Sequence, residues 1–156
     1  MTLDEFLRLG RTVTLASHHL TADEIKTFAR AYDPQPFHLD EEAAKNSVFG
    51  RLCASGWHTA ALWMRYNVRP QNPDALYQWT GEGPAPEFGP SPGYSDLKWR
   101  KPAFADETLT FTREMTGYRP LTSRPGWVVA SLNAAALNAQ GEAIMTLTNA
   151  VLVKAP

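Results

Sequence analysis

Hydrophobic residues follow two different spacings in the two halves of the chain. In TADEIKTFARAY they recur at the i, i+3, i+4, i+7 spacing of one buried helix face, at Ile25, Phe28, Ala29 and Tyr32. Thr21 and Glu24 form a capping-box pattern ahead of them, in which each side chain can satisfy a free amide. Pro34 disfavours helical torsion angles at Asp33, so the spacing predicts a helix that ends there.

Two further helices are expected downstream. Asp40 can cap a short helix over EEAAKNS, whose first turn carries Glu41 and Glu42 near the positive end of the dipole. The next segment, CASGWHTAALWMRYNV, is apolar nearly all round. Such a helix is typically buried in the middle of a protein rather than laid on its surface, and this one must end before Pro70.

The second half of the chain begins with a segment rich in Pro and Gly and then alternates with a period of two. Residues 69–94 have no periodicity and are too many for an ordinary connector, which indicates a lid, a binding loop or an interface loop. SDLKWRKPAF, ETLTFTREMTGY, GWVVASLNAAALNAQG and EAIMTLTNAVLVK then predict four strands, with a hairpin turn at NAQGE; RTVTLAS would add a fifth. Early helices followed by antiparallel strands predict an α+β fold in which a sheet wraps around the apolar helix.

Composition narrows the class of protein. A chain of 156 residues with 44% apolar and 20% charged residues predicts one soluble globular domain over residues 1–156. A formal net charge of −1 gives no reason to expect nucleic acid or an anionic membrane as a partner. We find no apolar run long enough for a signal peptide at the N-terminus or for a membrane span elsewhere. A cytoplasmic location is the expectation.

The only cysteine, Cys53, excludes an internal disulfide and a cysteine-rich zinc site. It lies in the apolar segment FGRLCASGW, which favours a buried structural role over a nucleophilic one. His38 and His58 lack the spacing and partners of a ligand set, and no Gly-rich phosphate loop is present. The sequence therefore predicts neither a metal nor a tightly held cofactor. His58 is expected to be satisfied in the core, and His18 and His19 to lie in a solvated loop.

The stretch AYDPQPFHLD holds a carboxylate and an imidazole five residues apart between two prolines. Pro34 and Pro36 restrict the backbone beside each group, so Asp33 and His38 are candidates for a pre-aligned general acid–base pair acting on one water. The alternatives are that His38 is a core histidine bonded to a carbonyl and that Asp33 caps a helix end or turn.

Gly56 stands at the start of the apolar helix, where backbone amides lack partners and the dipole is positive. A glycine there lets a ligand approach the backbone closely, although it is equally explained by tight packing.

These segments resemble the MaoC-type dehydratase family and the (R)-specific enoyl-CoA hydratases. The resemblance covers roughly residues 10 to 154 and is most specific over the Asp-to-His stretch. The family's order and spacing are kept at Asp33, Pro36, His38, Asp40, Phe49, Gly50, Ala54 and Gly56. This chain departs from the family pattern at Gln35 (usually Asn), Ser55 (often His), Ala105 (usually Gly) and Met64 (a Ser in some hydratases).

The resemblance implies a hot-dog fold and addition of water to, or its removal from, the C2–C3 bond of an acyl-CoA. Asp33 and His38 would supply the base and the acid, and Gly56 the oxyanion donor. Substrate contacts are expected from Gln35, Pro36, Phe37, Ser55 and Trp57. Coenzyme A would be a substrate carrier whose phosphates meet cations, with Arg51, Lys98, Arg100 and Lys101 as candidates that a solvated face explains equally well. Trp79 and Phe88 are expected to shape the acyl pocket.

Two other functions stay open from the sequence. A hot-dog thioesterase would direct water at the thioester carbonyl, and a non-catalytic subunit would bind acyl-CoA without turnover. By analogy with other hot-dog proteins, whose sheets join edge to edge, we expect at least a homodimer.

Overall fold

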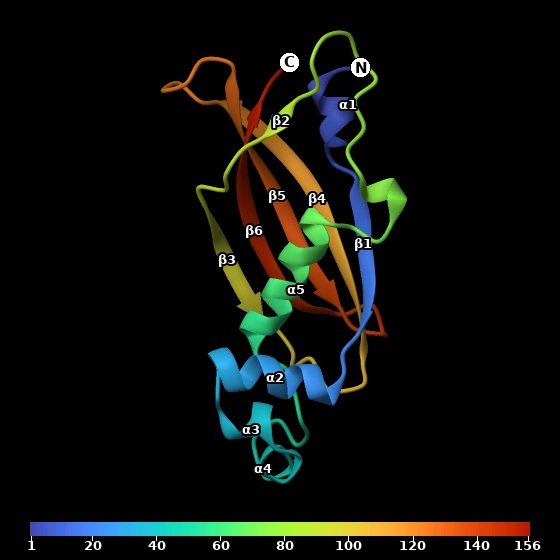
Figure 1. The fold of residues 1–156 in the computed structure, drawn as a ribbon, viewed down its shortest axis with the longest axis vertical. Coiled ribbons are helices and arrows are strands. Elements are labelled where there is room, and N and C mark those ends of the chain that lie inside the picture. The colour runs from blue at the N-terminus through green and yellow to red at the C-terminus, as the bar shows by residue number, and fades with distance from the viewer.

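The computed structural model describes residues 1–156 (Figure 1). The helices are α1 (Leu3–Leu7), α2 (Ala22–Tyr32), α3 (Pro36–Leu39), α4 (Glu41–Lys45) and α5 (Gly56–Val68), with a 3₁₀ turn, η1, at Pro73–Ala75. The strands are β1 (Thr12–His19), β2 (Glu87–Phe88), β3 (Gly93–Trp99), β4 (Thr108–Pro120), β5 (Trp127–Leu137) and β6 (Ala143–Lys154).

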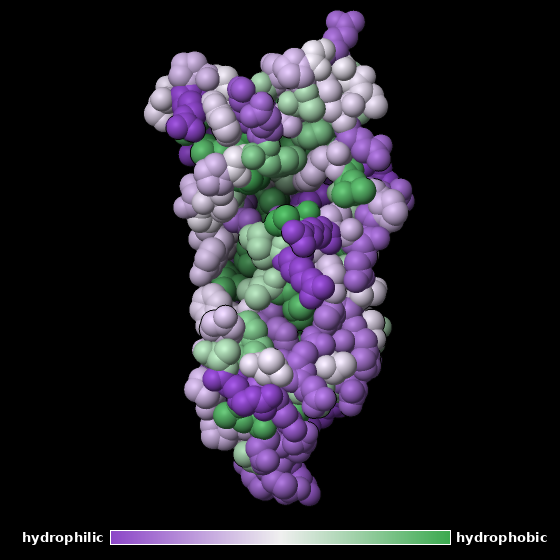
Figure 2. Space-filling view, in the orientation of Figure 1, coloured by the Kyte–Doolittle hydropathy of each residue, from purple (hydrophilic) through white to green (hydrophobic).

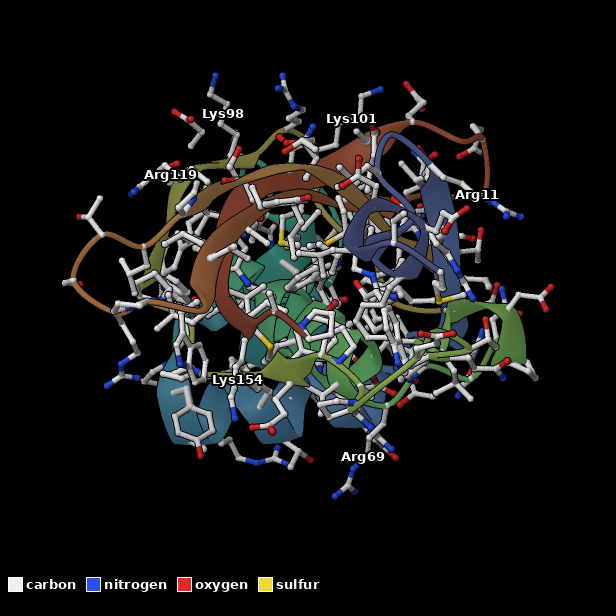
Figure 3. All side chains as sticks on the ribbon, turned by 90° about the horizontal axis from the view of Figure 1, so that it is seen from above. Arg11, Arg69, Lys98, Lys101, Arg119 and Lys154 are labelled. Atoms are coloured by element: carbon white, nitrogen blue, oxygen red, sulfur yellow. The ribbon has the colours of Figure 1, made fainter.

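All strands join one antiparallel sheet in the order β1-β4-β5-β6, and both β2 and β3 pair with β6. The sheet curves around α5, as the view along the long axis shows (Figure 3). The expected α+β arrangement, with an antiparallel sheet wrapped around a central helix, is confirmed. None of the helices has the length and hydropathy that a membrane crossing requires.

The core fills the space between α5 and the inner side of the sheet. Side chains of β4 and β5 alternate between buried and partly exposed, so that every second residue points at the helix. The buried side chains of the helix include Leu62, Trp63 and Tyr66. The Trp63 Nε1 atom donates a hydrogen bond of 2.9 Å to the Thr112 carbonyl. This bond fixes α5 on β4 and so fixes the position of the helix start.

The expectation that α5 is buried on all sides is wrong for this chain. Three of its apolar side chains are largely exposed: Trp57 by 50%, Met64 by 42% and Val68 by 68%. A single curved sheet can cover only one side of a helix, so a second apolar face stays uncovered. Apolar surface is accordingly visible over the middle of this side of the molecule (Figure 2).

Local structure departs from expectation at both ends of α2. Thr21 Oγ1 accepts from the Glu24 amide, but the Glu24 carboxylate turns to His18 instead of completing a capping box with the Thr21 amide. Tyr32 is 75% exposed rather than part of the buried face. The segment after Asp33 forms a helical turn, α3, where none was expected. Pro36 occupies its first position, where a missing N–H costs nothing.

A hairpin turn and a helix cap were predicted correctly, whereas two short elements were not predicted. NAQGE forms the expected hairpin turn, in which the Asn138 amide donates to Glu142 O and Gly141 has a φ of 76°. Asp40 caps α4 through the Ala43 amide. The short elements α1 and β2 were not predicted, because neither carries enough residues to show a period.

Candidate active site

The helices α2, α3 and α5 come together at the N-terminal end of α5 (Figure 1). A cavity of about 440 Å³ lies there. Asp33 follows the last residue of α2, His38 lies on α3, and Gly56 begins α5. All three line this one cavity. The structure therefore brings together the residues that the sequence singled out for catalysis.

Asp33 is held by its neighbours on two sides. Its Oδ1 atom accepts a 2.7 Å hydrogen bond from Gln35 Nε2, and its side chain is only 18% exposed. Burial pushes the pKa of the Asp33 carboxyl upward. The Ser55 hydroxyl and the Gln35 amide outweigh burial, with a smaller contribution from His38, and hold the pKa of Asp33 below its ordinary value. The group is a carboxylate at neutral pH.

His38 is oriented through its other ring nitrogen. Nδ1 lies 2.6 Å from the Cys53 carbonyl oxygen, which can only accept, so Nδ1 carries the proton and donates it. In the neutral ring, Nε2 then presents a lone pair, and this atom lies 3.4 Å from Asp33 Oδ2. Two hydrogen-bond acceptors thus face the cavity side by side. A molecule with two O–H donors can satisfy both, and water is the smallest such molecule.

The start of α5 supplies hydrogen-bond donors to the same space. The first amides of a helix have no intrahelical partners, and the Ser55 side chain makes no capping bond to them. The Trp99 indole packs directly on Gly56, where an added Cβ would lie 2.3 Å from ring atom Cε2. Gly56 is therefore both a tight-packing glycine and a part of the cavity wall, so the two readings of this residue are compatible.

The expected substrate-contacting residues divide into two groups. Gln35, Phe37 and Trp57 line the cavity. Pro36 and Ser55 do not. Ser55 is fully buried behind the wall, and its Oγ atom forms no hydrogen bond of normal length, so it acts on Asp33 only through its nearby dipole.

Of the four candidate cations, Arg100 and Lys101 line the cavity. Lys101 is paired with Glu142, whereas Arg100 has no carboxylate partner and donates to Thr146 Oγ1. Arg51 lies elsewhere, over the Phe104 ring. Lys98 points outward from the outer side of the sheet (Figure 3).

Several lining residues were not predicted. Thr59, Trp99, Pro102, Ala103 and Ile144 complete the wall of the cavity. Thr59 was within reach of sequence reasoning, since it lies three residues after Gly56 on the same helix. The others come from the second half of the chain, and their proximity depends on how the sheet curves.

The remaining histidines do not line the cavity, whereas Cys53 does. Cys53 is buried, as predicted, and burial raises the pKa of its thiol to about 11, which makes it a poor nucleophile. The expected loop at His18 and His19 is instead the end of β1, and His18 bonds to Tyr66 and Glu24. His58 is buried and lies 3.8 Å from Glu24, but its Nδ1 atom has no partner, so it is only partly satisfied.

Trp79 and Phe88, which were expected to shape the acyl pocket, do not line this cavity. Both pack against Phe6 in the part of the molecule around α1, beyond the far end of α5. Phe88 lines a second cavity there.

Comparison with known proteins places the chain in a family. The MaoC-like domain model matches residues 6–81. A crystal structure of the MaoC-like dehydratase from Rhodospirillum rubrum is 35% identical, covers 100% of this chain and 98% of its own, and superposes with a TM-score of 0.81. The chain belongs to the MaoC-like dehydratase family. Its wrapped-helix architecture is the hot-dog fold of that family.

Two further relatives extend the comparison. The (R)-hydratase from A. caviae involved in PHA biosynthesis is 26% identical over 95% of this chain and 96% of that one, with a TM-score of 0.66. The uncharacterized protein YdeM of Bacillus subtilis (strain 168) is 40% identical over 62 residues, which are 40% of this chain. The match spans only 43% of YdeM, less than half of that curated relative.

Proposed function

We propose that this MaoC-like protein is a hydro-lyase that adds water to the C2–C3 bond of an enoyl-CoA, or removes it from a 3-hydroxyacyl-CoA. Its membership of the MaoC-like dehydratase family and its 26% identity to an (R)-hydratase support this reaction class. Coenzyme A serves as the carrier of the acyl group, and the reaction needs no metal or redox cofactor.

The observation that carries the proposal is the pair of acceptors formed by Asp33 Oδ2 and His38 Nε2, 3.4 Å apart in one cavity. A water that donates one O–H to each group turns an oxygen lone pair away from both. That lone pair is then available to attack C3 of an enoyl thioester. Positioning of this kind removes much of the entropic barrier to reaction.

Protons balance within the pair. As the water oxygen bonds to C3, one of its protons passes to Asp33 Oδ2 or His38 Nε2 and an enolate forms; the same proton is then delivered from that group to C2. The pair ends with the charge it began with, and the product gains the elements of water. General acid–base help of this kind is typically worth about 10²–10⁴-fold in rate.

The developing negative charge gathers on the thioester oxygen and requires a donor. The Gly56 amide at the positive end of α5 meets this need, and the lack of a side chain makes room for the Trp99 indole in the same wall. One such donor is typically worth about 10²–10³ in rate. Arg100 and Lys101 at the cavity supply positive charge for the phosphates of coenzyme A.

A substrate panel tests the proposal and separates it from its two rivals. The protein is mixed with trans-2-enoyl-CoAs and saturated acyl-CoAs of several chain lengths, and products are followed by thioester absorbance, free-thiol release and mass. Hydration without thiol release supports the proposal. Thiol release without change at C2–C3 would identify a thioesterase, and binding without any product would identify a non-catalytic subunit.

A further inference from the structure

Arg113 is a buried cation without an anionic partner. It lies on β4, is only 4% exposed, and takes part in none of the ion pairs of the protein. Its Nη1 donates to the Asn67 Oδ1 atom at 3.0 Å and its Nη2 to the Ala75 carbonyl at 2.7 Å, while Tyr77 covers its face at 4.3 Å. These contacts fix the guanidinium in place. They leave part of its five-donor fork unused.

Arg113 lines a second cavity, of about 310 Å³, at the C-terminal end of α5. Asn149 lies on β6 in the same wall, and its Oδ1 atom accepts from Ser91 Oγ and from the Ala150 amide. Its Nδ2 group therefore points away from these donors and has no protein partner. The wall holds hydrogen-bond donors and no carboxylate; its other residues are mostly apolar, including Met64, Phe88, Leu132 and Val151.

A small apolar cavity of about 140 Å³ lies along α5 and shares lining residues with both of the other cavities. It shares Trp57 with the catalytic cavity, and Met64 and Asn149 with the cavity at Arg113. Trp57, Ala60, Met64 and Asn67 follow one another at the spacing of a single helix face. At about 1.5 Å per residue, the row from Gly56 to Asn67 is roughly 16 Å long.

The strand opposite matches this row. Leu147, Asn149 and Val151 lie on the inner side of β6 at alternate positions and line the connecting cavity, the Arg113 cavity or both. The three cavities thus lie one after another along α5 and β6 and share lining residues, and together they are called the groove. Apolar surface is visible along this side of the molecule in the region of α5 (Figure 2).

We propose that the groove holds the acyl chain of the substrate and that the far end of that chain carries a carboxylate, bound by Arg113 and Asn149. The inference rests on the proposed function, because it places the thioester at Gly56. A medium-length chain spans the distance, its methylene groups meet the apolar walls, and its carboxylate supplies the anion that Arg113 lacks. Charge-assisted bonds from a guanidinium to a carboxylate are the strong ones among protein hydrogen bonds.

Asn149→Asp is the deciding variant. Asp has nearly the shape of Asn and keeps an oxygen that accepts from Ser91 and Ala150, so the fold is expected to be retained. The variant replaces the free amide donor by a negative charge. We expect wild-type kcat/KM to be at least tenfold higher for a medium-chain ω-carboxy-2-enoyl-CoA than for the methyl-terminated thioester of equal length. In Asn149→Asp this preference should vanish or reverse.

A binding experiment tests the carboxylate site independently of the hydratase activity. Saturated ω-carboxyacyl-CoA and its methyl-terminated analogue are titrated calorimetrically into both proteins. Tighter wild-type binding of the carboxylated analogue, lost in Asn149→Asp, supports the carboxylate site even if no hydration is observed. Equal affinities together with equal kcat/KM values would overturn it and leave the hydratase proposal intact.

Binding of a free fatty acid tests whether the bound carboxylate belongs to the acyl-CoA substrate or to a separate ligand. The free acid should compete with methyl-terminated acyl-CoA, because both need the same groove. Binding of the free acid that is abolished by Asn149→Asp and leaves acyl-CoA binding unchanged would also overturn the inference, since the site would then serve a separate ligand.

Discussion

At the scale of single residues, the sequence predicted which residues form the site more easily than which residues contact them. Asp33, His38 and Gly56 could be chosen from the printed sequence, because their spacing and their prolines are local features. Their partners could not. The Cys53 carbonyl that orients His38 and the Trp99 ring that covers Gly56 come from segments 15 and 43 residues away, and only the fold brings them together.

Gln35 differs from the residue usual in the family, and the structure shows the effect of this difference on Asp33. It stands where the family usually has Asn, and its amide reaches back to Asp33 Oδ1 at 2.7 Å. The side chain of Gln35 is longer than that of Asn, but it still donates a hydrogen bond to the Asp33 carboxylate.

The lowered pKa of Asp33 predicts a pH-dependent contribution to stability. Its ordinary value is near 3.8 and its folded value is lower, so the folded protein binds fewer protons than the unfolded chain in this range. The stabilisation is present above the unfolded pKa and is lost as pH falls through the folded one. In urea titrations from neutral pH to about pH 3, the free energy of unfolding of Asp33→Asn should fall less than that of wild type.

Asp23→Asn, at an exposed position in the first turn of α2, is the matched control. It keeps Asp33 and should follow wild type through the acid range. If the free energy of unfolding fell equally with pH in wild type and Asp33→Asn, the neighbours of Asp33 would not stabilise its carboxylate.

At the scale of elements, periodic segments were predicted and aperiodic ones were not. The helix over Ala22–Tyr32 and the strands β4, β5 and β6 carry enough residues to show a period of 3.6 or 2. The turn α3 was missed because two prolines were taken only as breakers, although Pro is favoured at the first position of a helix. This turn aims His38 at Asp33, so the least predictable element completes the site.

Capping of α2 should be measurable at the same scale. Thr21 Oγ1 accepts from the Glu24 amide at the helix start. Thr21→Ala should lower the free energy of unfolding by about 1 kcal/mol, because the helix start loses its cap. Thr27→Ala makes the same chemical change at an exposed position inside the helix and should be neutral or slightly stabilising. Chemical denaturation gives both values, and equal losses would argue against a capping role.

At the scale of the whole molecule, an apolar surface suggests that the chain is completed by a second copy. Trp57, Met64 and Val68 on α5 and Tyr94 on β3 are exposed side chains on one side of the molecule. β3 pairs only with β6, so its other edge is free. The apolar character of α5 was read from the sequence correctly, but one sheet covers only half of the helix. A second chain would cover the open side of the groove.

We therefore predict that the protein is at least a dimer at micromolar concentration, with twice the chain mass of 17.3 kDa. Tyr94→Asp places a charge on the exposed patch at β3 and should raise the dissociation constant at least tenfold in sedimentation equilibrium. Tyr32→Asp, at a 75% exposed position on α2, is the control and should leave association unchanged. A wild-type protein that sediments as a monomer would contradict the prediction.

The joint action of Asp33 and His38 on one water is tested most directly by comparing wild type with Asp33→Asn, His38→Ala and the double variant. The measurement is kcat/KM for hydration of the best enoyl-CoA, with Asp23→Asn and His19→Ala as surface controls. Because the two groups act as a unit, each single variant should lose about 10²–10⁴-fold and the double variant little more. Single variants that hydrate enoyl-CoA as fast as wild type would contradict the account.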